Sequence, residues 1–107
     1  MEKEAVIINY EGDALRAVLP RDIDHHVAKY IRGNIDREMA QRLPRRLVLD
    51  FSAVTFMDSS GIGLIIGRTE QARKYGIYVE LVGVSADIMR LIRICGVEKI
   101  KDLYILQ

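Results

Sequence analysis

The chain has 107 residues, enough for one hydrophobic core but not for two, so we expect a single domain spanning residues 1–107. Half of the residues are apolar, 29% are charged and the formal net charge is +1. This composition is typical of a soluble globular protein and argues against direct binding of nucleic acid or an anionic membrane surface. The single cysteine excludes an intramolecular disulfide, and no apolar stretch suits a membrane span or a signal peptide, so we expect a cytoplasmic protein.

The N-terminal part of the chain predicts a β-hairpin followed by a helix. Residues 5–10 and 14–19 are rich in apolar, strand-forming side chains and are separated by a Glu-Gly-Asp turn, which favours a hairpin that Pro20 ends. Asp24 is a good N-cap for a helix that runs to about Arg42. The apolar stripe of this helix recurs every four positions and consists of Val27, Ile31, Ile35 and Met39.

The middle of the chain predicts a central strand and a second helix. Residues 46–51 are mostly apolar, as expected of a strand in the middle of a sheet. A helix is predicted from about Ser60 to Lys74, and we expect its two glycines, Gly63 and Gly67, to pack closely against the sheet. Gly76 is expected to end it as a left-handed cap. Three arginines that flank Leu43-Pro44 are expected in a solvated connector: Arg42, Arg45 and Arg46.

The C-terminal part predicts a strand at residues 77–82, a third helix and a weak edge strand at residues 100–106. Ser85 is the expected N-cap of that helix and Gly96 its end. Cys95 falls in its apolar stretch and is expected to be a buried core thiol. The predicted order is β-β-α-β-α-β-α-β, which indicates an α/β fold with a mixed β-sheet and helices packed on it.

The corner between the central strand and the second helix carries the strongest functional signal. Asp58 is a good N-cap, and a helix start leaves about four backbone N–H groups unpaired with a partial positive charge, which suits an anion. Ser59 and Ser60 place two hydroxyl groups at this corner. The pattern fits both a well-capped helix start and an exposed functional serine, and spacing alone does not separate the two.

Catalytic and cofactor motifs do not match. The serines at the corner lack the glycines of a nucleophile elbow, and residues 67–69 imitate only the end of a P-loop, inside a predicted helix. His25 and His26 are adjacent and lack neighbours at metal-ligand spacing. Asp50 and Asp58 as an acid–base pair are less favoured than a strand end and a helix cap. We therefore expect no catalytic residue, no cofactor and no metal, which leaves a modification acceptor or a docking surface.

The segment 54–63, Val-Thr-Phe-Met-Asp-Ser-Ser-Gly-Ile-Gly, resembles the phosphorylation motif of bacterial anti-sigma factor antagonists of the STAS domain family. Residues 23–26, Ile-Asp-His-His, resemble the second shared element of that family. Residues 84–91 and 94–97 look like its third helix and the glycine that stops it. These elements cover most of the chain, and the first two are most similar to the sporulation member of the family.

The resemblance implies a non-enzymatic switch. In the family, the unphosphorylated protein binds an anti-sigma factor that is itself a serine kinase using ATP and magnesium, and this binding frees the sigma factor. Phosphorylation of the first serine after the aspartate, here Ser59, reverses binding, and a phosphatase restores it. The implied partner-binding residues are Arg21, Asp24, His25, Asp58, Ser59, Ser60 and Gly61.

Two alternatives remain beside this switch. Family members often carry glycine where this chain has Arg21-Asp22, which implies an altered docking surface, so one alternative is a scaffold or stress-signalling STAS module with another kinase partner. The other is a small hydrolase or nucleotide-binding protein that uses Asp58 and Ser59, and the lack of a general base in the motif disfavours it. A transporter-associated STAS domain is disfavoured because no membrane segment accompanies it.

Overall fold

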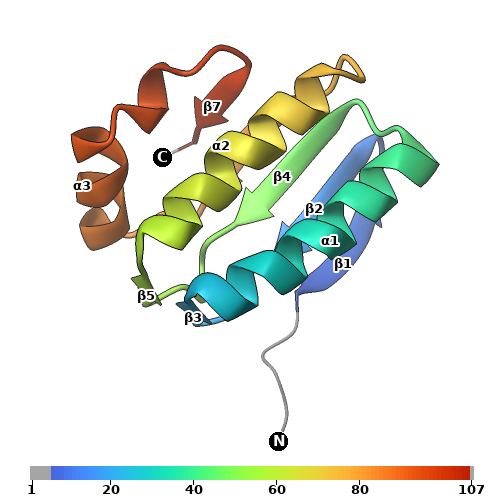
Figure 1. The fold of residues 1–107 in the computed structure, drawn as a ribbon. Helices are drawn as coiled ribbons and strands as arrows, with labels where there is room; N and C mark the ends of the chain where they lie inside the picture. Colours follow the sequence, from blue (N-terminus) through green and yellow to red (C-terminus); the bar gives the residue numbers. More distant parts are fainter. Residues whose placement is uncertain (1–5, 107) are drawn as a thin grey trace, which may run out of the picture.

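A computed structural model describes residues 6–106, which form an α/β fold of three α-helices and a mixed β-sheet (Figure 1). Part of the predicted first strand, Ala5, lies outside the described residues. The elements in chain order are β1 (Ile7–Glu11), β2 (Ala14–Val18), β3 (Asp22–Ile23), α1 (His25–Arg42), β4 (Arg46–Asp50), β5 (Phe56–Met57), α2 (Ser59–Arg73), β6 (Tyr78–Val82), α3 (Ala86–Ile94), the 3₁₀ turn η1 (Val97–Lys99) and β7 (Leu103–Ile105).

The main sheet has the order β1-β2-β4-β6-β7, in which β1 and β2 form the predicted antiparallel hairpin and all other pairs are parallel. One row of the register runs Leu15, Leu47, Val79 and Leu103, and all four side chains are buried. Helices α1 and α2 lie side by side over the sheet (Figure 1). The core therefore lies between these helices and one face of the sheet.

The opposite face of the main sheet, called here the outer face, carries charged side chains that are paired across strands. Arg16 on β2 lies 2.6 Å from Asp50 of β4, between its Nη2 and the carboxylate Oδ2. Arg46 on β4 lies 2.7 Å from Glu80 of β6 and 3.5 Å from Asp13. The prediction of Arg46 in a solvated connector was wrong, because β4 begins at this residue and its guanidinium has carboxylate partners.

The helix boundaries follow from the capping residues that the sequence predicted. Asp24, Asp58 and Ser85 are the N-caps of the three helices, and each side chain accepts a hydrogen bond from a backbone N–H of the first turn. Gly76 and Gly96 have φ angles of +72° and +73°, the left-handed conformation expected after a helix. Among the described residues, every helix falls short of the length and apolarity needed to cross a membrane.

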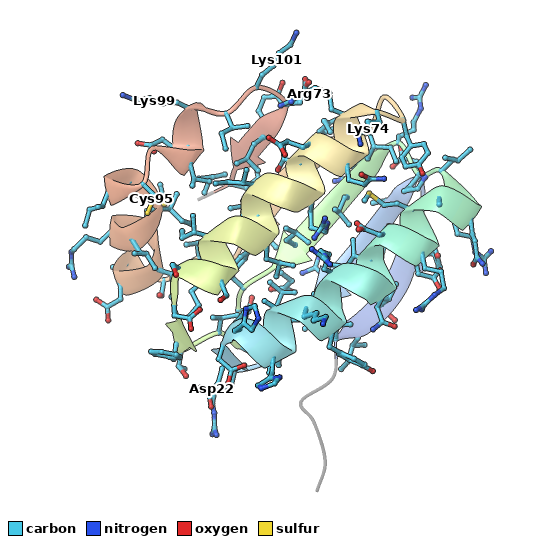
Figure 2. The ribbon with its side chains drawn as sticks, in the orientation of Figure 1. Asp22, Arg73, Lys74, Cys95, Lys99 and Lys101 are labelled. Carbon is cyan, nitrogen blue, oxygen red and sulfur yellow. The ribbon has the colours of Figure 1, made fainter. Side chains whose placement is uncertain are left out.

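Cys95 is exposed, so the prediction of a buried thiol was wrong. Helix α3 ends at Ile94, itself 76% exposed, and buries its other side. Gly96 then turns the chain into η1, whose Val97 is fully buried. Val97 therefore belongs to the core, whereas Cys95 lies exposed at the end of α3 (Figure 2).

The expected close packing of Gly63 and Gly67 against the sheet was also wrong. No atom lies within 4 Å of the position that a Cβ would occupy at either glycine. The buried positions of α2 are others, including Ile62, Ile65 and Ala72. The two glycines therefore leave open space beside α2 and do not pack against the sheet.

Candidate functional site

A second, two-stranded sheet formed by β3 and β5 brings the starts of α1 and α2 together, and the sequence patterns did not predict it. The strands are parallel, with Asp22 opposite Phe56 and Ile23 opposite Met57. Ile23 and Met57 are buried, which anchors the pair in the core. Because each strand leads directly into a helix, the two helix N-termini lie at the same end of the molecule (Figure 1). We call this end, comprising residues 21–26 and 55–61, the helix-start end.

The two aspartates that follow these strands are occupied as helix caps. The Asp24 carboxylate accepts a hydrogen bond of 3.0 Å from the backbone N–H of Val27. The Asp58 carboxylate accepts one of 2.8 Å from the N–H of Ser60, and the carbonyl of Asp58 accepts one of 2.9 Å from Gly61. The caps therefore satisfy backbone donors that a bare helix start would leave unpaired.

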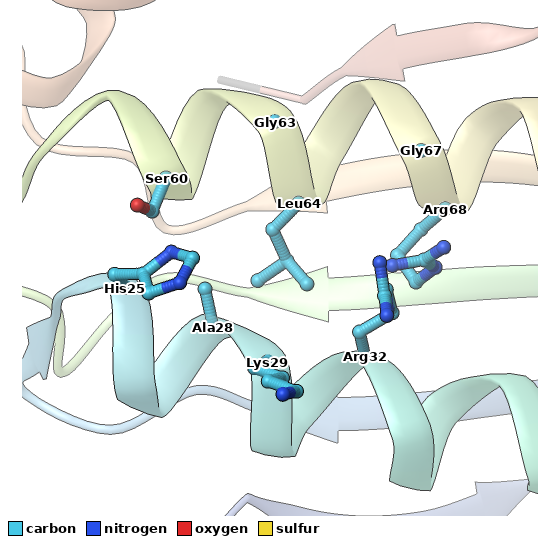
Figure 3. Close-up of a pocket in the computed structure, with 9 residues that line it drawn as sticks. All are labelled: His25, Ala28, Lys29, Arg32, Ser60, Gly63, Leu64, Gly67 and Arg68. Carbon is cyan, nitrogen blue, oxygen red and sulfur yellow. The ribbon is translucent and has the colours of Figure 1, made fainter.

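The two serines of the motif differ in their surroundings. Ser59 is the first residue of α2, is exposed, and its hydroxyl makes no hydrogen bond with any residue in the range 6–106. Ser60 is half-buried, and its side chain lines a pocket between α1 and α2 together with His25 (Figure 3). Of the two hydroxyl groups, that of Ser59 is the more accessible to another protein.

Gly61 has a packing reason to be glycine. A Cβ at this position would lie 2.6 Å from the sulfur of Met57 and 2.9 Å from its Cβ, and the latter cannot move without moving β5. Only glycine lets α2 begin this close to β5. The glycine of the motif thus fixes where Ser59 lies relative to the β3–β5 pair.

Arg21 and His25 lie at the same end with exposed side chains. The Arg21 guanidinium lies 3.6 Å from the Asp22 carboxylate, and both side chains are well exposed. The backbone carbonyl of Arg21 accepts hydrogen bonds from the N–H groups of Thr55 and Phe56. The fold therefore uses only the backbone of Arg21, and its side chain is available at the surface.

A pocket of about 410 Å³ lies between α1 and α2 (Figure 3), and no pattern in the sequence predicted it. Its lining residues are His25, Ala28, Lys29, Arg32, Ser60, Gly63, Leu64, Gly67 and Arg68. Arg68 is buried, with its Nε 2.7 Å from Asp36 Oδ1. The sequence signal that could have indicated this pocket is Arg68, a charged residue inside an otherwise apolar stretch of the second helix. Within residues 6–106, no group of three or more His, Cys, Asp or Glu side chains is arranged to hold a metal.

Comparison with known proteins identifies the family. The STAS domain model matches residues 11–104. An anti-sigma F factor antagonist of Paenibacillus polymyxa is 31% identical over 86 residues, which cover 80% of this chain and 74% of that protein. An anti-sigma-B factor antagonist of Listeria monocytogenes is 28% identical over 94 residues, covering 78% and 82%.

Solved structures with a similar fold agree with the sequence comparison. The structure of the Bacillus cell fate determinant SpoIIAA in its phosphorylated form superimposes with a TM-score of 0.74, at 22% identity, over 96% of this chain and 92% of that one. The mixed sheet, the three helices and their order are therefore those of this fold. The chain belongs to the STAS domain family and, within it, to the anti-sigma factor antagonists.

Proposed function

We propose that this chain is an anti-sigma factor antagonist whose binding to an anti-sigma serine kinase is switched off by phosphorylation of Ser59. The observation that carries the proposal is the exposed Ser59 hydroxyl, which has no hydrogen bond within residues 6–106, at the corner between β5 and α2. The structural relative SpoIIAA is known in a phosphorylated form, which supports a phosphorylation switch but does not by itself identify the acceptor residue. In this proposal the unphosphorylated chain occupies the kinase and so releases a sigma factor.

The chain itself supplies only the acceptor hydroxyl. The Ser59 oxygen attacks the γ-phosphorus of ATP held by the kinase with magnesium, the new oxygen–phosphorus bond forms, and ADP leaves. The hydroxyl proton passes to a base of the kinase, because the nearest carboxylate in the sequence, Asp58, is occupied as the helix cap. A separate phosphoprotein phosphatase would hydrolyse the ester and restore binding.

The phosphate need not unfold the domain to prevent binding. It adds about −1.5 to −2 charges at pH 7 at a position that we propose lies inside the interface. The helix N-terminus stabilises the added charge by about 0.3–1 kcal/mol. Each unit of phosphate charge is repelled by roughly 3 kcal/mol by a carboxylate about 5 Å away at an effective dielectric constant near 20. A similar cost in the interface corresponds to roughly a hundredfold loss of affinity.

The proposed docking surface is the helix-start end. The β3–β5 pair holds Asp24 and Asp58 at the starts of neighbouring helices, and the side chains of Arg21, His25 and Ser60 accompany them. Gly61 contributes by setting the position of Ser59 through its contact with Met57.

Intact-mass analysis after incubation with a candidate anti-sigma kinase from the same genome, ATP and magnesium tests the switch. We expect one added phosphate on the unmodified chain and on Ser60→Ala, and none on Ser59→Ala. Ser59→Ala should still bind the kinase but should not be released by ATP, and Ser59→Asp should bind weakly with an unchanged fold. Release of Ser59→Ala by ATP would overturn the assignment of Ser59.

A second candidate function differs from the first in the regulatory pathway to which the kinase partner belongs. Because the relatives include an anti-sigma-B as well as an anti-sigma F factor antagonist, the kinase partner could belong to a stress response or to sporulation. Pairwise binding measurements with each anti-sigma kinase of the same genome separate these candidates. Binding to none of them, by a folded chain, would favour a scaffold role.

A further inference from the structure

We propose that the pocket between α1 and α2 is a binding site for a small organic phosphate, which adjoins the proposed docking surface at His25 and Ser60. The first reason is the charge of its lining. Lys29, Arg32 and Arg68 contribute three positive charges, and the carboxylate that pairs with Arg68, Asp36, removes one, which leaves two. A phosphate monoester carries about this charge with the opposite sign at neutral pH.

The guanidinium groups of Arg32 and Arg68 lie near each other in the pocket, and the Asp36 carboxylate compensates one of their two positive charges. Figure 3 shows the Arg32 and Arg68 side chains reaching toward each other from α1 and α2. Burial lowers the pKa of Arg68, and the neighbouring Arg32 lowers it further, against the opposing effect of Asp36. Arg68 Nε is paired with Asp36 Oδ1 at 2.7 Å, so this carboxylate compensates only one of the two guanidinium charges. A bound anion would relieve this repulsion and provide acceptors for both groups.

The shape of the pocket gives the second reason. Gly63 and Gly67 cost helix stability, about 1 kcal/mol each relative to alanine, yet neither is needed for packing against the sheet. Their lack of side chains is what opens the wall of the pocket along α2. The volume of about 410 Å³ exceeds that of a phosphate group alone, and Ala28 and Leu64 add apolar surface. The occupant that fits is therefore a phosphate attached to a small organic group.

Pyrophosphate is a suitable probe, because it tests the cationic part of the pocket without requiring the natural ligand. We would titrate the full chain with pyrophosphate and follow backbone amide shifts by NMR, which also reports the fold of each variant. We expect saturable shifts along the facing sides of α1 and α2, with an affinity that falls as salt is added.

Three variants locate the binding. Arg32→Gln removes one exposed cation and should weaken pyrophosphate binding about tenfold. Gly67→Leu keeps every charge but fills the opened wall, and should weaken binding at least as much. Arg37→Gln is the matched control, because it removes the same charge from the same helix at an exposed position outside the pocket, and should leave the affinity unchanged.

Several outcomes would overturn the proposal. These are no saturable binding at millimolar pyrophosphate, an equal loss in Arg37→Gln and Arg32→Gln, or unchanged binding by Gly67→Leu. The last two would indicate diffuse attraction of anions to α1. None of these measurements involves the kinase, so their failure leaves the proposed switch at Ser59 untouched.

Discussion

The outer face of the sheet and the helix-start end both present polar groups to solvent, but they use them differently. On the outer face, Arg16 and Arg46 each have a carboxylate partner within 2.7 Å on a neighbouring strand. At the helix-start end, the Asp24 and Asp58 carboxylates serve as caps and the Ser59 hydroxyl has no partner among residues 6–106. Polar groups on the outer face therefore contribute to the stability of the fold, whereas the Ser59 hydroxyl contributes no hydrogen bond to the fold within residues 6–106.

The largest effect should come from the outer face. Asp50 accepts hydrogen bonds from Arg16 at 2.6 Å and from the N–H of Ser52 at 2.9 Å, and its side chain is nearly buried. Asp50→Ala should lower the free energy of unfolding by about 2–3 kcal/mol, because both donors lose a charged acceptor. Urea denaturation measures this loss. Asp13→Ala is the control and should cost less than about 0.5 kcal/mol, because Asp13 is well exposed. Similar losses in both variants would contradict the assigned role of Asp50.

The glycines of α2 provide the next comparison. Gly61→Ala should lower the free energy of unfolding by about 1–3 kcal/mol, because the added methyl group overlaps the Cβ of Met57. Gly63→Ala, two residues later, should raise it by up to about 1 kcal/mol, because the helix gains a better helix former in open space. Thermal and urea denaturation of both variants check the opposite signs. A stabilising Gly61→Ala would show that α2 can shift along β5.

Most of the fold could be predicted from local signals, because caps and apolar periodicity depend on nearby residues. Asp24, Asp58 and Ser85 each cap a helix as their sequence context indicates. The β3–β5 pair could not be predicted, because two-residue strands have no periodicity and their pairing depends on the docking of distant segments.

The candidate site likewise has one part that the sequence predicted and one part that it did not. The corner with Ser59 was found from its strand-to-helix pattern, and the resemblance to a family identified which serine to examine. The pocket was missed because its lining comes from two helices that only tertiary packing brings together. Gly63 and Gly67 are visible in the sequence, but their pattern does not reveal whether they contact the sheet or leave space beside α1.

The pH dependence of stability gives a smaller effect with a defined sign. Partial burial raises the pKa of Asp50, but the hydrogen bonds from Ser52 and Arg16 outweigh it and hold this pKa below its usual range. The stabilisation from Asp50 is therefore fully present above its unfolded pKa of about 3.9 and is lost as the pH falls through the folded value. The stability difference between the unmodified chain and Asp50→Asn should shrink between pH 6 and pH 3, as followed by urea denaturation.

Asp36 is a control for this prediction, because its pKa is shifted in the opposite direction to that of Asp50. Burial raises the pKa of its carboxyl above the usual value, despite the opposing effects of Arg68 and Arg32. Protonation in acid should therefore relieve a cost in the folded state, so the effect of Asp36→Asn should change with pH in the opposite direction to that of Asp50→Asn. A parallel trend for both variants would contradict the assignment of the two environments.

The smallest effect should come from Ser59 itself. Ser59→Ala should change the free energy of unfolding by less than about 0.5 kcal/mol, because the hydroxyl is exposed and has no hydrogen bond to lose within the described chain. Asp58→Ala, one residue earlier, should cost about 1 kcal/mol, because it removes the acceptor for the Ser60 N–H. Urea denaturation of the two variants at pH 7 measures the contrast. Equal losses would mean that the Ser59 hydroxyl also caps α2, and the helix-start end would then resemble the outer face, with its polar groups committed to stability.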